Sequence, residues 1–169
     1  MQLMLFTDGS VNPQLRVGYG AYLACSEGFG SLNSLADHIR LKLFVETSST
    51  KLELQTLLWA LSEISAAEII SYTDSQHIAG LNSRRKKLEE NDYYAKNEKR
   101  LNNYKLYKQF YKFTDDLNIT FSKVKGHTPS SKKSDVERIF SLVDRASRNA
   151  LRAYSTGLSS GLNRQKQKY

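Results

Sequence analysis

IISYTD, at residues 69–74, is an apolar run that ends at an acidic side chain, and LMLFTD, at residues 3–8, has the same form. Both runs predict β-strands. A helical pattern lies between them, so the crossover rule makes the two strands parallel. Because parallel strands end at one edge of a sheet, Asp8 and Asp74 should be neighbours there. The two stretches therefore predict an α/β fold with a pair of carboxylates at a sheet edge.

The remaining elements follow from hydrophobic periodicity and from turn residues. Gly, Ser and Asn residues between 27 and 34 predict a turn, and the first three strands should form an antiparallel meander. A polar loop is predicted over 128–135. The predicted elements are strands over 2–7, 18–25, 38–46, 68–73 and 118–125, and helices over about 50–65 and 136–154.

Residues 156–169 are polar and basic without periodicity, which predicts a mobile tail after one domain over 1–155. The net charge of +8 favours a nucleic-acid or anionic-surface partner, although solubility alone is the alternative. Cys25 is the only cysteine, so no internal disulfide is possible and we expect a cytoplasmic location. We also expect a monomer without a signal peptide or a membrane span, because no run approaches about 18 apolar residues.

Two more acidic residues lie in or beside apolar helical stripes. Glu53 is followed by apolar residues at i+4, i+7, i+8 and i+11, which places it on the buried face of its helix. Asp144 lies in the last helix. Two carboxylates 4 Å apart repel by about 4 kcal/mol at an effective dielectric of about 20, so four together would recruit cations. Oxygen ligands select Mg²⁺ or Mn²⁺, and two such ions can support phosphodiester hydrolysis.

Each acid taken alone has a structural alternative. Asp8-Gly9 is a common turn pair, Asp74-Ser75 can cap a helix, Glu53 can favour a helix N-terminus, and Asp144 can be merely solvated. The combination of four acids on these elements is what indicates a metal site.

A basic segment over 84–112, which is predicted to be helical, opens with Arg84, Arg85, Lys86 and Lys87 and interleaves cations with tyrosines. The alternative to substrate binding is a solvated helix whose aromatic residues pack on the sheet. We expect both to hold, with the cations facing outward and the aromatic residues largely in the core. Those aromatic residues are Tyr104, Tyr107, Phe110 and Tyr111.

Six motifs resemble those of type 1 ribonuclease H, over about residues 3–154. They are FTDGS at 6–10, GYGA at 18–21, SSTKLEL at 48–54, YTDSQ at 72–76, VKGH at 124–127, and VD at 143–144 with Ala150. The resemblance implies a ribonuclease H-like fold, with a mixed five-stranded sheet of order 3-2-1-4-5 and helices on both faces. It also implies endonucleolytic cleavage of the RNA strand of an RNA/DNA hybrid with two Mg²⁺ ions, for which Mn²⁺ could substitute.

By match of position, the resemblance implies that Asp8, Glu53, Asp74 and Asp144 are the catalytic metal ligands. His127 would assist proton transfer or product departure. The segment 84–112 corresponds to the family's substrate-gripping handle, so Arg84, Arg85, Lys86 and Lys87 would hold the DNA strand. Asn12 and Gln76 match positions that contact the minor groove, and Ser49 and Thr50 stand where the family often has two asparagines.

Two departures from the family pattern bear on the site. The stretch between His127 and Asp144 is long, which makes Asp135 a competing candidate for the fourth acid. We favour Asp144 because it lies within the helix. His77 replaces a tyrosine usual in the family, which we interpret as a packing change.

Other functions stay open at this point. They are a catalytically silent hybrid- or RNA-binding module of the same fold, another nuclease of the superfamily such as a junction resolvase, and a basic partner-binding domain. The VKGH motif disfavours a resolvase, and the four acids argue against the other two.

Overall fold

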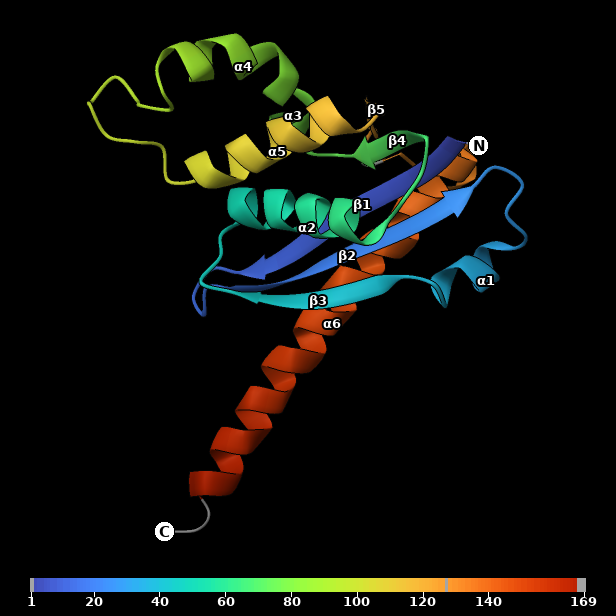
Figure 1. Ribbon diagram of the computed structural model, residues 1–169. Coiled ribbons are helices and arrows are strands. Elements are labelled where there is room, and N and C mark those ends of the chain that lie inside the picture. The colour runs from blue at the N-terminus through green and yellow to red at the C-terminus, as the bar shows by residue number, and fades with distance from the viewer. Residues whose placement is uncertain (1, 127, 167–169) are drawn as a thin grey trace.

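The structure is a computed structural model that describes the backbone of residues 2–126 and 128–166, with side chains up to residue 158. This part of the chain contains five strands and six α-helices (Figure 1). The strands are β1 (Gln2–Asn12), β2 (Val17–Ser26), β3 (Arg40–Val45), β4 (Glu68–Thr73) and β5 (Ile119–Lys123). The helices are α1 (Leu32–Ala36), α2 (Ser49–Glu63), α3 (Gln76–Ala79), α4 (Leu81–Glu90), α5 (Tyr104–Asp116) and α6 (Asp135–Lys166), with a 3₁₀ turn over Ser130–Lys132.

The strands form one mixed sheet in the order β3-β2-β1-β4-β5, which confirms the predicted fold class. β1 pairs antiparallel with β2 and parallel with β4, and β5 is parallel to β4. The parallel pairing of β1 and β4 ends at Phe6 and Tyr72. The pairing of β1 with β2 continues to Asn12, so β1 is longer than the predicted strand over 2–7.

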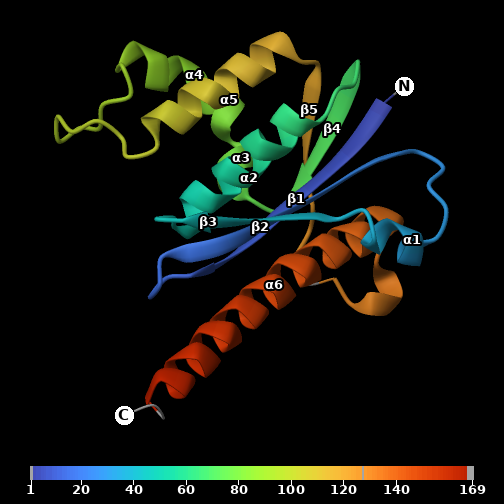
Figure 2. The ribbon, with the colours of Figure 1, turned by 60° about the horizontal axis from the view of Figure 1, so that its bottom comes forward.

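Helices cover both faces of the sheet (Figure 2). Leu5 belongs to the core beneath α2 and α5, which also contains the buried residues Leu57 and Phe110. Met4 and Phe6, its neighbours on β1, belong to the core beneath α1 and α6. This alternation follows from the two-residue period of a strand.

Helix α2 lies close to the sheet because glycines face it. A Cβ at Gly20 would lie 2.2 Å from Thr56 Oγ1, and a Cβ at Gly18 would lie 2.6 Å from Leu52 Cδ2. Gly9 also faces Leu52. The GYGA motif therefore has a packing role, since it lets the helix that carries Glu53 approach β1 and β2.

Two further elements differ from the prediction. α1 forms within the expected turn, where Ser31 Oγ accepts a hydrogen bond from the Ser34 backbone N–H. α6 does not end near 154 but continues to Lys166, through much of the stretch expected to be a mobile tail. A helix can continue without an apolar stripe once its first turns are fixed, because propagation costs less than nucleation. The domain boundary at 155 stays a prediction.

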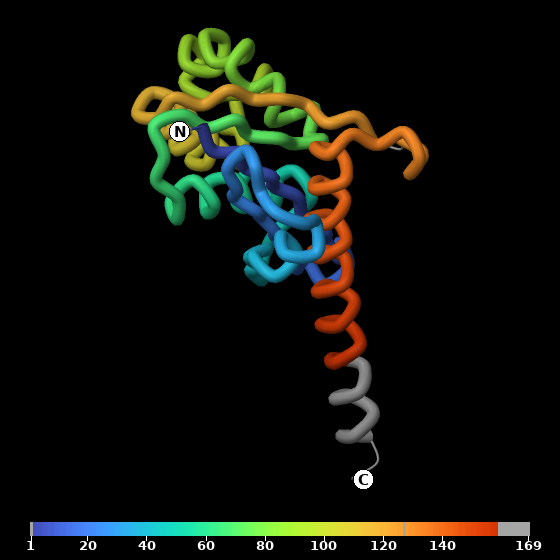
Figure 3. The backbone as a smooth tube through the Cα atoms, turned by 90° about the vertical axis from the view of Figure 1, so that its right-hand side faces the viewer, coloured from blue at the N-terminus to red at the C-terminus, as the bar shows by residue number. Residues whose placement is uncertain are grey.

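Figure 3 shows α6 running past the body of the sheet. Among the residues that the structure describes, no helix has both the length and the apolar character that crossing a membrane requires.

Candidate active site

Asp8 and Asp74 lie side by side on neighbouring parallel strands. Asp8 follows Phe6 by two residues on β1 and so points toward the same face, the α6 face, while Asp74 directly follows the last residue of β4. Burial raises the pKa of Asp8 to about 8, and the negative charge of Asp74 adds to the rise. The pKa of Asp74 is also raised, chiefly by burial and further by Asp144, while Lys123 opposes the rise. The structure thus brings together the pair of acids that parallel-strand geometry predicted.

Glu53 reaches this pair from α2, whose N-terminus is capped by Ser48. The Ser75 hydroxyl donates a hydrogen bond to Glu53 Oε2 at 2.5 Å. Burial raises the pKa of Glu53, the bond from Ser75 counteracts this, and the charge of Asp74 raises it further. Asp8, Glu53 and Asp74 line one small pocket at the edge of the sheet.

Asp144 reaches the pair from α6. Its charge and a hydrogen bond contribute to the raised pKa of Asp8, so its carboxyl lies beside that residue. The fully buried Ser147, one turn later, ties α6 to β1: its hydroxyl donates to the Asp144 carbonyl at 2.9 Å and lies 3.0 Å from Ser10 Oγ. Asp135 is the exposed first residue of α6 and does not join the other acids. The structure therefore places Asp144, and not Asp135, beside Asp8.

The four carboxylates suit a hard divalent cation. They supply only oxygen atoms, and the charges of Asp74 and Asp144, which add to the effect of burial on the pKa of Asp8, are charges that a cation would neutralise. Two of the four are engaged elsewhere, because Asp144 forms an ion pair with Arg148 and Glu53 accepts from Ser75. Within residues 2–126 and 128–158, no three Asp, Glu, His or Cys side chains already form a ligand set. Binding an ion would thus require small side-chain rotations, above all by Asp144.

A cleft of about 400 Å³ adjoins these acids, between the loop after β5 and α6. Asp74 and Asp144 line it together with basic residues that include Lys133 and Arg148. Glu137 holds the loop against α6, since it accepts hydrogen bonds from Thr128 Oγ1, the Ser134 N–H and Ser134 Oγ.

Sequence reasoning missed Glu137, although Ser134 and Glu137 have the spacing of a helix capping box, with Ser134 Oγ accepting from the Glu137 N–H. It also missed Ser75 and Arg148 as partners of the acids. His127, the predicted proton-transfer residue, lies outside the described residues.

The four predicted minor-groove residues lie at the ends of their elements. Asn12 caps the β1–β2 turn, because its Oδ1 accepts from the N–H groups of residues 14 and 15. Ser49 and Thr50 are exposed in the first turn of α2. Gln76 is exposed at the start of α3 and accepts a hydrogen bond from Lys123 at 2.6 Å. Gln76 thus lies two residues from Asp74, at the rim of the acidic site.

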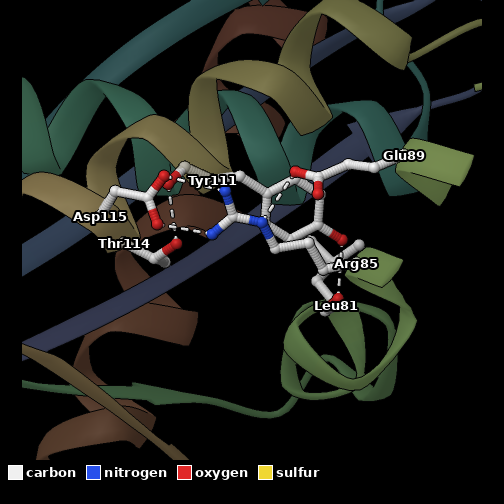
Figure 4. A network of polar contacts seen from close by, with 6 residues as sticks. All are labelled: Leu81, Arg85, Glu89, Tyr111, Thr114 and Asp115. Carbon is white, nitrogen blue, oxygen red and sulfur yellow. Dashed lines mark hydrogen bonds and ion pairs between the residues drawn. The ribbon is translucent and has the colours of Figure 1, made fainter. Parts of the chain in front are cut away.

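The predicted substrate cations of α4 fall into two groups. Arg84, Lys86 and Lys87 are exposed. Arg85 instead binds α4 to α5: it pairs with both Asp115 oxygens, at 2.5 and 2.8 Å, and with Glu89 at 2.8 Å (Figure 4). Its guanidinium also lies 5.0 Å from the centre of the Tyr111 ring, and the Tyr111 hydroxyl donates to the Leu81 carbonyl at 2.7 Å. Arg85 therefore stabilises the basic segment, and the other three cations are available to a ligand.

The aromatic residues of α5 behave as expected. Tyr107, Phe110 and Tyr111 are buried, and Tyr104 is half-buried beneath the guanidinium of Arg100. His77 packs against Tyr107, with ring centres 5.6 Å apart, which agrees with a packing role.

The fold and the site geometry are those of a ribonuclease H-like α/β protein, and comparison with known proteins gives the family. The ribonuclease H family model matches residues 1–150, so the chain belongs to this family. No curated protein matches the chain significantly.

Two solved structures share the fold. A foamy viral protease-reverse transcriptase in complex with dsDNA aligns over 86% of this chain and 92% of its own, with 12% identity and a TM-score of 0.60. The native Prototype Foamy Virus protease-reverse transcriptase aligns over 87% of this chain at 17% identity and a TM-score of 0.67. This chain covers only 20% of the latter protein.

Proposed function

We propose that the protein is a Mg²⁺-dependent endonuclease that hydrolyses the RNA strand of RNA/DNA hybrids. The observation that carries the proposal is the convergence of Asp8, Glu53, Asp74 and Asp144 at one edge of a ribonuclease H sheet. Four acids in that position lower the stability of the metal-free fold, and a cation-binding role explains their presence.

Each proposed ligand has its own support. The hydrogen-bonded strands β1 and β4 fix the backbone at Asp8 and next to Asp74, and Ser75 orients Glu53. The contacts of Ser147 with the Asp144 carbonyl and with Ser10 of β1 hold the turn of α6 that carries Asp144 next to β1. Two bound divalent ions would supply an activated water and stabilise the leaving oxygen. The residues of the chain position these ions and the phosphodiester, and the exposed cations Arg84, Lys86 and Lys87 hold the other strand without reading its sequence.

A cleavage assay tests the proposal. It incubates an end-labelled RNA/DNA hybrid, a duplex RNA and a duplex DNA, each with Mg²⁺ or with EDTA. We expect cleavage confined to the RNA of the hybrid and lost in EDTA. Equal cutting of duplex DNA would indicate another nuclease of the superfamily. Tight hybrid binding without cleavage would indicate a silent binding module.

Two substitutions test the ligand assignment. Asp74→Asn should abolish turnover and leave folding and hybrid binding largely intact, and retained activity would refute its role. Asp144→Asn should lower activity by at least 100-fold, whereas Asp135→Asn, the matched change at an exposed acid of the same helix, should have little effect. The reverse result would make Asp135 the fourth ligand.

A further inference from the structure

The cleft beside the acids carries a balanced set of charges. Among the described residues, three basic side chains and three acidic side chains line it, and hydroxyl groups of Thr128 and Ser141 lie between them. The basic residues are Lys125, Lys133 and Arg148, and the acidic residues are Asp74, Glu137 and Asp144. The cleft as it stands is therefore close to neutral.

Glu137 is already used by the fold. Its bonds to Thr128 and to both groups of Ser134 lower the pKa of its carboxyl, so it stays ionised and attached to the loop. The remaining acids, Asp74 and Asp144, are two of the proposed metal ligands. Divalent ions at those two residues would leave three basic side chains against Glu137 alone, and the cleft would then attract an anion.

Two of the basic side chains have partners that they can exchange. Arg148 pairs with Asp144 across one helical turn, with side chains 56% and 31% exposed. Such an exposed pair contributes little stability. Lys133 donates to the neutral Ser141 hydroxyl at 2.7 Å. A divalent ion is a stronger partner for Asp144 than a guanidinium is, and a phosphate is a stronger partner for Arg148 and Lys133 than a hydroxyl is.

We propose that this cleft is a phosphate subsite for the cleaved strand, and that Arg148 moves from Asp144 to a phosphate oxygen when divalent ions bind. The inference rests on the proposed function and deepens it. In the metal-free protein, Arg148 neutralises Asp144. In the loaded protein the same guanidinium holds the strand beside the carboxylates.

The first test titrates the free protein with Mn²⁺ by calorimetry, without nucleic acid. Arg148→Gln removes the competitor for Asp144 and should bind the ion about 2- to 5-fold more tightly than wild type. Arg145→Gln removes an equal charge from an exposed site on the same helix and is the matched control. Equal Mn²⁺ affinities for the two variants would overturn the exchange.

The second test measures hybrid cleavage with Mg²⁺. Arg148→Gln should raise KM by about 10-fold, and Arg145→Gln by less than about 3-fold, because only Arg148 contacts a phosphate. Arg148→Lys keeps the charge and loses the two-pronged contact, so its KM should lie between those of wild type and Arg148→Gln. Equal KM values for Arg148→Gln and Arg145→Gln would overturn the phosphate subsite.

The two proposals fail in different ways. If the wild-type protein binds the hybrid without cutting it, the proposed function fails, and hybrid affinity in Mg²⁺ replaces KM as the measure of the subsite. If it does not bind the hybrid, the subsite is refuted as well. Circular dichroism of each variant separates loss of contact from loss of folding.

Discussion

Asp8 is a residue whose placement costs stability in the metal-free protein. It lies within β1, half-buried and beside Asp74 and Asp144, and its pKa is about 8 in the fold against 3.8 for a free side chain. Between about pH 4 and pH 8 the unfolded chain gives up this proton while the folded chain keeps it. The free energy of unfolding therefore falls as pH rises through that window.

Asp8→Asn removes this titration and keeps the shape of the protonated acid. In EDTA, the variant should gain stability relative to wild type as pH rises from 5 to 8, reaching on the order of 2 kcal/mol, measured by urea unfolding. Mg²⁺ should reverse the order, because it stabilises only the protein that binds it. A stability difference that does not change with pH, or one matched by Asp135→Asn, would contradict the explanation.

At the scale of elements, the position of α2 depends on the space that glycines leave on the sheet. Gly20 faces Thr56, and Gly18 and Gly9 face Leu52, next to Glu53 in the chain. The distance of α2 from β1 and β2 thus decides how near Glu53 lies to the strand acids.

Gly20→Ala should destabilise the protein by about 1–3 kcal/mol, because the new methyl group would overlap the Thr56 hydroxyl. A second change, Thr56→Ala, should recover part of that loss, so the double-mutant cycle should give a clear coupling energy. Gly30→Ala is the control, since its methyl group would meet only Ser34 Oγ at 3.6 Å. If the losses of unfolding free energy for Gly20→Ala and Thr56→Ala simply added, α2 would be free to move away from the sheet.

Besides the ion pair of Arg85 with Asp115, a hydrogen bond from Tyr111 joins helices α4 and α5. The Tyr111 hydroxyl is buried, its pKa is raised to about 12 chiefly by burial, and it donates to the Leu81 carbonyl at the start of α4. Tyr111→Phe should cost about 1–2 kcal/mol of unfolding free energy, because that carbonyl loses its donor. Tyr94→Phe, at an exposed ring, should cost much less. Equal thermal shifts for the two variants would contradict this role.

At the scale of the whole molecule, the charge of +8 includes exposed cations on α4 that lie on the opposite face of the sheet from α6 (Figure 2). If they hold phosphates, they determine how salt affects hybrid affinity. Replacing Lys86 and Lys87 by Gln should reduce the slope of log affinity against log salt concentration by about 2. The same double change at Arg40 and Lys42, on the edge strand β3, should reduce it less. Equal slopes for the two variants would place the hybrid elsewhere.

Much of this architecture could be predicted from the sequence. The buried face of α2 and the pairing of Asp8 with Asp74 follow from periodicity and the crossover rule, and the full strand order follows from the resemblance to ribonuclease H. α1 could not be predicted, because five residues provide too little periodicity. The contact of Arg148 with Asp144 was accessible in principle from its i,i+4 spacing.

The internal role of Arg85 shows the limit of such reasoning. The sequence indicates a cation in a basic segment, yet Asp115 lies 30 residues away and only the packing of α4 on α5 brings the two together. The bond from Ser75 to Glu53 is of the same kind, since it joins the end of β4 to α2. The sequence thus predicted which acids lie together and not which side chains orient them.

The shared register of β1 and β4 has a last consequence, for tolerance to insertion and deletion. Because successive side chains on a strand alternate in direction, losing or gaining one residue between Glu68 and Tyr72 would turn over the rest of β4 and displace Asp74, which directly follows it, from Asp8. All four acids would survive such a change, and their convergence would not. The length of β4 is therefore under as strict a constraint as the identity of any acid that follows it.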